Sequence, residues 1–200
     1  MATRWSWMCS RGCGSLGAMS RLAPRGRMND LHYFDIQARK WHEVNVRNAP
    51  SERYGHTAVL DTQQRMWIFW AGNFWNSGWL NDVHYFDTKA RQWHEVTAKN
   101  AADAPVGREG ATAVLYGLEM WIFAGYNGGW LNDLHYFDIQ AEMWHEVIAS
   151  NAPSERYSHS AVLDAEQRMW IFGVKGRDDS DSQWVNDLHY FNLKAFNKAA

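Results

Sequence analysis

A β-propeller, an all-β fold in which four-stranded sheets stack around a common axis, is predicted by three features of the sequence. A heptapeptide, NDLHYFD or a close variant, starts at residues 29, 81, 132 and 186, so the chain repeats every 51 to 54 residues. Each period holds four short segments rich in β-branched and aromatic residues and bounded by Gly, Asp, Asn or Pro, which is typical of strands. One of these segments, MWIF, is apolar at every position, which indicates a strand covered on both faces by neighbouring sheets.

The four expected strands of each period follow a fixed order. RYGHTAVLD and its variants start at residues 53, 108 and 156, MWIF starts at 66, 120 and 169, the heptapeptide follows, and WHEV starts at 41, 93 and 144. The links, such as DTQQR and IQARK, are only a few residues long, as antiparallel neighbours require. No link leaves room for a helix, so the sequence predicts sheets alone.

This arrangement resembles the kelch repeat, in which Arg opens strand one, an aromatic-apolar strand two ends near Gly, and Trp lies on strand four. The resemblance covers roughly residues 29–196. It implies a kelch-type β-propeller in which the strand-one arginines are often buried and structural. One feature departs from the family, because the Gly-Gly doublet after strand two reads Ala71-Gly72, Ala124-Gly125 and Gly173-Val174. We therefore expect the local turn to differ there.

Strand counting predicts an arc of about three blades within residues 28–196. A half blade at 28–47 precedes blades at 53–99, 108–149 and 156–196, the last without its fourth strand, and these supply 13 strands. Propellers usually have about 4–8 blades, so the arc does not close alone. Three outcomes stay open: the chain is part of a longer protein with a larger ring, two chains form a six-bladed homodimer, or the arc stands open. Residues 197–200 are expected to be a tail.

Residues 1–27 are expected to lie outside the propeller. They contain five Arg, no Asp, Glu or Lys, and both cysteines of the chain, Cys9 and Cys13. They lack the apolar block of a secretory signal. The alternatives are a disordered leader, an organelle transit peptide, or sequence from an inaccurate gene start. The absence of cysteine from the remaining chain fits a reducing compartment, so we expect a cytoplasmic protein, with organelle targeting as the alternative.

The overall composition is that of a globular protein, with 46% hydrophobic and 21% charged residues. The net charge of −2 provides no basic field for nucleic acid or for an anionic membrane surface. No run approaches the ~18 apolar residues that span a bilayer. These observations argue against nucleic-acid and membrane partners.

Catalytic, metal and cofactor sites are not expected. All nine histidines occupy repeat positions. Equivalent positions in adjacent blades are about 10 Å apart, whereas zinc–nitrogen bonds need about 2 Å. Copper enzymes that resemble kelch propellers use a Cys crosslinked to Tyr, which a cysteine-free propeller cannot supply. The sequence also lacks a nucleophile elbow, a phosphate loop and HExxH.

Protein binding is the predicted function, with an enzyme or a carbohydrate- or small-ligand-binding propeller as the alternative. The loops from strand two to strand three vary between the repeats, at 70–80, 124–131 and 173–185, while the scaffold stays constant. Trp79, Trp130 and Trp184 recur, which suggests packing between blades. The candidate partner-binding residues lie in these loops and at the start of strand one: Phe74, Trp75, Tyr126, Asn127, Asp178, Asp179, Asp181, Arg53, Arg108 and Arg156.

Overall fold

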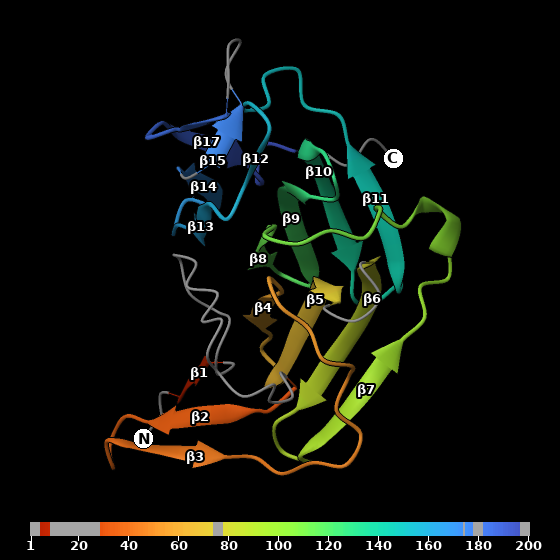
Figure 1. Cartoon of the computed structure of the whole chain (residues 1–200), viewed down its shortest axis with the longest axis vertical. Helices are drawn as coiled ribbons and strands as arrows, with labels where there is room; N and C mark the ends of the chain where they lie inside the picture. The colour runs from red at the N-terminus through yellow and green to blue at the C-terminus, as the bar shows by residue number, and fades with distance from the viewer. Residues whose placement is uncertain (1–4, 9–28, 74–77, 174, 178–181, 197–200) are drawn as a thin grey trace.

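The structure, a computed structural model, describes residues 5–8, 29–73, 78–173, 175–177 and 182–196. Within these residues the chain forms 17 β-strands and one short 3-10 turn, Ala101–Asp103. Four sheets follow one another in chain order along an open arc, with a small fifth sheet beside the last (Figure 1). The predicted all-β, kelch-type β-propeller architecture is confirmed.

All strand pairs are antiparallel, and most of them join strands that are neighbours in the sequence. The first sheet contains β1 (Trp5–Met8), β2 (His32–Asp35) and β3 (Lys40–Glu43). The second contains β4 (Thr57–Leu60), β5 (Arg65–Asn73), β6 (Gly78–Asp87) and β7 (Gln92–Val96). The third contains β8 (Thr112–Tyr116), β9 (Glu119–Tyr126), β10 (Trp130–Asp138) and β11 (Met143–Val147). The fourth contains β13 (Ser160–Leu163), β14 (Arg168–Phe172) and β17 (Leu188–Asn192), and the small sheet contains β12 (Arg156–Tyr157), β15 (Lys175–Arg177) and β16 (Ser182–Trp184).

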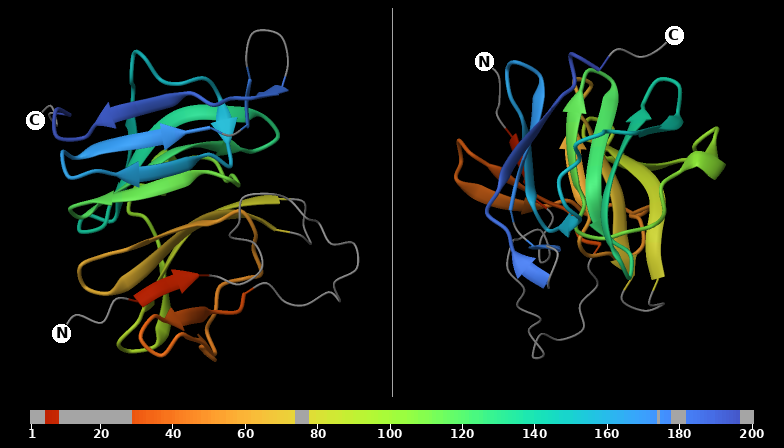
Figure 2. Two further views of the ribbon diagram at one scale, coloured as in Figure 1. Left: turned by 90° about the vertical axis from the view of Figure 1, so that its left-hand side faces the viewer. Right: turned by 90° about the horizontal axis from the view of Figure 1, so that it is seen from above.

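The sheets stack face to face, as Figure 2 shows in its left view. Strand β4 contacts β8, and β8 contacts β13, so the first strands of successive sheets line the inner side of the arc. Backbone hydrogen bonds also join equivalent repeat positions of successive blades, from Gly110 N to Gly55 O (2.9 Å) and from Ser158 N to Gly110 O (2.7 Å). This arrangement is that of blades around a propeller axis.

The MWIF strands form the core between the sheets, and their side chains alternate between its two sides. Met66 and Ile68 pack with the first sheet, whereas Trp67 and Phe69 pack with the third. The same alternation recurs in β9, where Met120 and Ile122 face the second sheet and Trp121 and Phe123 face the fourth. The expectation that these strands are covered on both faces is therefore correct for β5 and β9.

The heptapeptide recurs because its residues make the same contacts in the successive blades. Its final Asp closes the turn to strand four: Asp87 Oδ1 accepts hydrogen bonds from the backbone N–H groups of Lys89 and Ala90 at 2.8 Å. Its Tyr stacks on the His of WHEV, as in Tyr136 on His145 at 4.6 Å. The other members of these two sets are Asp35, Asp138 and Asn192 for the turn, and Tyr33 and Tyr85 for the stacking.

Four strands add to the 13 predicted. β1 corrects the expectation that residues 1–27 lie outside the fold, because Trp5–Met8 pairs with β2 in the place of a strand two. β15 and β16 correct the expected 173–185 loop, since they form a hairpin that pairs with β12. β12 is the start of the predicted first strand of the last blade, which is divided into β12 and β13. The other two expected loops are also shorter, because β5 and β6 extend into 70–80 and β9 and β10 into 124–131.

The number of sheets among the described residues changes the number of blades expected in a ring of two copies. Each chain contributes four main sheets, so two copies contain eight and not the six of the predicted homodimer. Eight is the upper end of the usual propeller range of about 4–8 blades.

Candidate functional site

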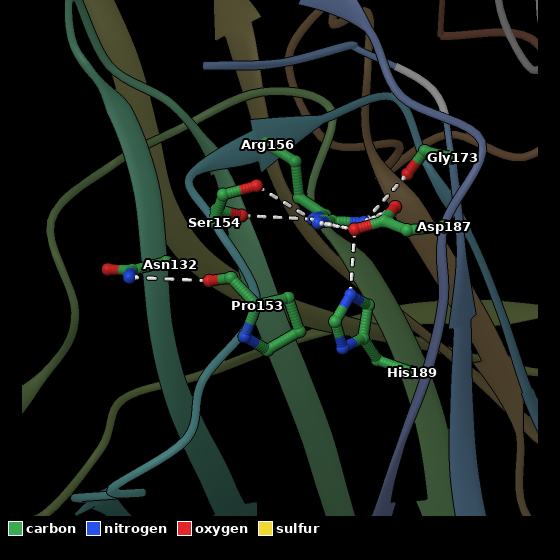
Figure 3. A network of polar contacts seen from close by, with 7 residues as sticks. All are labelled: Asn132, Pro153, Ser154, Arg156, Gly173, Asp187 and His189. Atoms are coloured by element: carbon green, nitrogen blue, oxygen red, sulfur yellow. Dashed lines mark hydrogen bonds and ion pairs between the residues drawn. The ribbon is translucent and has the colours of Figure 1, made fainter. Parts of the chain in front are cut away.

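The end of the arc that carries the loops between strands two and three is built on a repeated Arg–Asp–His unit. Arg156 Nη1 and Nη2 each donate to one carboxylate oxygen of Asp187 at 2.8 Å, and His189 Nε2 lies 2.7 Å from the same carboxylate (Figure 3). Arg156 also donates to the backbone oxygens of Ser154 (3.0 Å) and Gly173 (3.4 Å). The equivalent units are Arg53–Asp82–His84 and Arg108–Asp133–His135.

The carboxylates of these units stay ionised. Burial raises the pKa of Asp133, but hydrogen bonds from His135 and Arg108 outweigh it and hold the pKa well below its usual range. Hydrogen bonding to Arg156 is the largest effect on Asp187 and also lowers its pKa. Each unit is therefore a bidentate ion pair that ties the segment before β4, β8 or β13 to the third strand of the blade or to the residue just before it.

This pairing corrects the prediction that Arg53, Arg108 and Arg156 contact a partner. Their side chains are buried, with at most 5% of the surface exposed, and both terminal nitrogens of each guanidinium are hydrogen-bonded within the blade. The structure gives them a structural role, which is the role that the kelch resemblance implied.

The altered Gly-Gly doublet contributes to the same unit. Ala124, at the first position, adopts a left-handed backbone with φ of 57°, and Gly173 does the same with φ of 60°. This conformation turns the Ala124 carbonyl toward Arg108, whose Nη1 donates to it at 3.1 Å. A Cβ on Gly125 would lie 3.0 Å from the Glu109 carbonyl oxygen, so the second position has no room for a side chain.

A row of aromatic side chains lies at this end and crosses from the second to the fourth blade. Trp79 contacts Tyr126 edge-on at 6.1 Å, Tyr126 contacts Tyr157 at 5.5 Å, and Trp130 contacts Tyr157 at 5.7 Å. Trp79 is 39% exposed and the other three are half-buried. The expected packing of Trp79 and Trp130 between blades is present, whereas Trp184, in the last blade, is 71% exposed.

A carboxylate lies beside this row. Glu109 pairs with Tyr126 through two backbone hydrogen bonds of 2.9 Å. Burial raises the pKa of Glu109, and burial together with the Glu109 charge raises the pKa of Tyr54, which is hydrogen-bonded to it. We call Tyr54, Trp79, Glu109, Tyr126, Trp130 and Tyr157 the loop-end surface.

The predicted partner-binding residues are only partly at this surface. Tyr126 belongs to it, and Asn127 shapes the turn beside it by accepting a hydrogen bond from Gly129 N at 3.4 Å. Phe74, Trp75, Asp178, Asp179 and Asp181 lie outside the residues that the structure describes. Sequence reasoning missed Tyr54, Glu109 and Tyr157, although one signal was present: Glu109 stands where the other two repeats have Tyr.

The histidines are placed by contacts within the blades and between neighbouring blades. Besides the Asp-bound set, His159 Nε2 lies 2.6 Å from Thr112 Oγ1 of the preceding blade. Burial and the Arg156 charge lower the pKa of His159 to about 3, and burial and Arg53 lower that of His56 to about 4, so both are neutral near pH 7. Within the described ranges, no group of three His, Cys, Asp or Glu side chains is placed to hold a metal ion.

A stack of antiparallel sheets, in which an Arg–Asp pair ties the second, third and fourth sheets, defines a kelch-type β-propeller segment. Residues 17–197 match the model of the KLHDC2/KLHL20/DRC7 Kelch-repeats domain, and the chain therefore belongs to the kelch-repeat family.

Relatives at about 30% identity include two kelch domain-containing proteins and an adagio-like protein. Kelch domain-containing protein 3 of Homo sapiens is 30% identical over 185 residues, which cover 85% of this chain and 47% of the relative. Putative adagio-like protein 2 of Oryza sativa subsp. japonica is 32% identical over 175 residues, which cover 83% of this chain and 27% of the relative. Kelch domain-containing protein 10 of Homo sapiens is 29% identical over 151 residues, which cover 72% of this chain and 34% of the relative. The chain spans between a quarter and a half of the length of these relatives.

Proposed function

We propose that the chain is a protein-interaction module of the adaptor or scaffold kind, and that its partner docks on the loop-end surface. The aromatic row carries this proposal, because it crosses neighbouring blades and stays partly exposed. Tyr and Trp are enriched at the energetic centres of protein interfaces. The Arg–Asp–His units hold the loops rigidly, which lowers the ordering cost of binding.

The partner's chemistry follows from the composition of this surface. Five aromatic residues beside one carboxylate favour a segment with an apolar anchor and a hydrogen-bond donor or a positive charge. The loop tips with Phe74, Trp75, Asp178, Asp179 and Asp181 remain proposed additional contacts at the same end.

Enzymatic activity is not part of the proposal, and neither are nucleic-acid or membrane partners. Across the described part of the chain, no helix has the length and apolar character needed to cross a bilayer. The cytoplasm is the proposed compartment, since residues 29–200 contain no cysteine. A second copy of the chain, in the predicted homodimer, remains a further proposed partner.

Affinity capture from the source cell with matched variants tests the docking surface. Trp79→Ala and Glu109→Gln alter the loop-end surface, whereas Gln140→Ala alters an exposed turn at the opposite end. We expect the first two to weaken capture of the partner, with Trp79→Ala costing at least about 2 kcal/mol, or roughly 30-fold in affinity. Gln140→Ala should bind like the wild type. Equal capture by all four folded proteins would place the binding site elsewhere.

A further inference from the structure

The third blade departs from the repeat at one position of the loop-end surface. The residue after the buried arginine is Tyr54 in the second blade and Tyr157 in the fourth, but Glu109 in the third. The arginine itself forms the same ion pair with an aspartate in all three blades. The fold therefore does not require a carboxylate at this position, and another reason is needed for its presence.

The Glu109 carboxylate is half-buried, and no positively charged side chain of the described residues pairs with it. It accepts a hydrogen bond from Tyr54, which is a neutral donor, and burial raises the pKa of Glu109. Asp133 of the same blade differs, because hydrogen bonds from His135 and Arg108 hold its pKa low. Glu109 thus keeps the capacity to accept further hydrogen bonds, and an incoming cation would offset the cost of its burial.

Aromatic rings lie beside this carboxylate on neighbouring strands. Glu109 lies directly opposite Tyr126, with backbone hydrogen bonds of 2.9 Å in both directions, and Tyr126 lies opposite Trp130. Directly opposed residues have Cβ atoms about 5 Å apart, so these three side chains form one row across the strands. Tyr157 contacts Tyr126 at 5.5 Å and Trp130 at 5.7 Å. The carboxylate therefore lies at the edge of a cluster of three rings.

A guanidinium group matches both parts of this arrangement. It is planar and stacks on Tyr and Trp rings, and its N–H groups bind a carboxylate as a fork. The chain makes this combination internally at the opposite end of its blades. Arg168 Nε donates to Asp164 at 2.7 Å while its guanidinium lies 5.1 Å from the centre of the Trp170 ring, and Arg65 makes the equivalent contacts in the second blade. The six residues of the loop-end surface supply the carboxylate and the rings, but not the guanidinium.

We propose that the partner docked on the loop-end surface inserts an arginine side chain, whose guanidinium pairs with Glu109 and stacks on the rings of Tyr126 and Tyr157. The site depends on the proposed function of this surface and specifies the chemistry that it recognises. Lysine fits less well, because an ammonium group is a compact point charge that does not form the planar fork. One side chain supplies only part of an interface, so we expect a dissociation constant on the order of 1 mM for the isolated contact.

Titration with capped single amino acids tests the site without knowledge of the partner. N-acetyl-arginine amide is the probe, and N-acetyl-lysine amide and the neutral N-acetyl-citrulline amide are its controls. NMR measures binding from the shifts of the indole N–H signals of Trp79 and Trp130, which contact Tyr126 or lie opposite it. Trp79→Phe and Trp130→Phe assign these two signals.

The wild type should bind the arginine probe, and Glu142→Gln, which removes a surface carboxylate that is 45% exposed in a turn of the same blade, should bind it equally well. Glu109→Gln should weaken binding by at least about tenfold, because the charged half of the fork is lost. Glu109→Tyr restores the residue of the other two blades and should weaken binding to the same extent while the protein stays folded. The citrulline probe should bind the wild type at least about tenfold more weakly than arginine.

Absence of arginine binding to the wild type at about 10 mM would overturn the site, and so would equal binding of arginine and lysine or binding that survives Glu109→Gln. Capture of the partner with Trp79→Ala tests the docking surface separately. Capture that depends on Trp79, without arginine binding, would leave the proposed function in place and overturn the arginine site. Arginine binding that depends on Glu109, with capture unchanged by Trp79→Ala, would support the site and contradict the docking of the partner there.

Discussion

Replacing Asp133 by Asn should destabilise the protein far more than an isosteric change normally does. The substitution removes the carboxylate that the Arg108 guanidinium, which is 1% exposed, binds with two hydrogen bonds. Arg108 also donates to the carbonyls of Val106 and Ala124, and these neutral acceptors do not replace an ionised carboxylate. Breaking a buried ion pair on one side typically costs about 3–5 kcal/mol. We expect a loss of that size in the free energy of unfolding.

Urea unfolding followed by tryptophan fluorescence measures this loss, and Glu142→Gln is the matched control. Glu142 pairs with Lys99 at 3.4 Å on the surface, where the side chains are 45% and 62% exposed, so its loss should cost no more than about 0.5 kcal/mol. Combining Asp133→Asn with Arg108→Met also removes the positive charge of Arg108. The free energy of unfolding of the double variant should therefore fall by less than the sum of the two single losses. Equal effects of Asp133→Asn and Glu142→Gln, or strict additivity in the double variant, would refute the structural role of the pair.

Two further changes test the buried histidine and the altered doublet. The pKa of His159 lies near 3 in the folded protein, below the ~6.5 of the unfolded chain, so the unfolded state binds a proton first and stability falls as pH drops below about 6.5. Between pH 7 and pH 5 the wild type should lose about 2 kcal/mol more than His159→Gln in urea titrations; parallel pH profiles would contradict this. Ala124→Gly should raise stability by about 0.5–1 kcal/mol by relieving the left-handed backbone, net of the entropy of Gly, while Gly125→Ala should lower the melting temperature. A lower melting temperature for Ala124→Gly, or a higher one for Gly125→Ala, would contradict this account of the doublet.

The strands of each blade were predictable because their patterns depend on local sequence and repeat. MWIF, the heptapeptide and WHEV each fall on the expected strand of a blade. The first strand was predicted too long, since Arg53–His56 lies before β4, which begins at Thr57. The left-handed Gly55 in this segment, with φ of 66°, interrupts the extended backbone. A period-two pattern alone does not reveal such a turn.

The added strands were hidden for a different reason. The stretch at 173–185 is polar and charged, and such a composition predicts a loop when no pairing partner is known. Its strands β15 and β16 form because Arg156–Tyr157 offers an edge to pair with, and that contact spans about twenty residues. Likewise, the Trp5–Met8 strand depends on β2, not on its own short pattern.

The candidate site was predictable in place but not in composition. The variable loops predicted a binding site at the end of the blades where Tyr126 lies, and this stays a prediction. The sequence could not show that Arg108 is neutralised by Asp133, 25 residues away, although Arg and Asp recur together in every complete period. The Glu109–Tyr54 contact joins two blades, so only the stacking of the sheets brings these residues together.

A double-mutant cycle on Phe69 and Trp144 tests the stacking of the sheets most directly. These residues are separated by 75 positions and meet only across the core between the second and third sheets, at 5.7 Å. Phe69→Leu, Trp144→Leu and the double variant, compared by urea unfolding, should give a coupling energy of about 0.5–1.5 kcal/mol. Losses that add to within about 0.3 kcal/mol would mean that the two sheets do not pack against each other in this way.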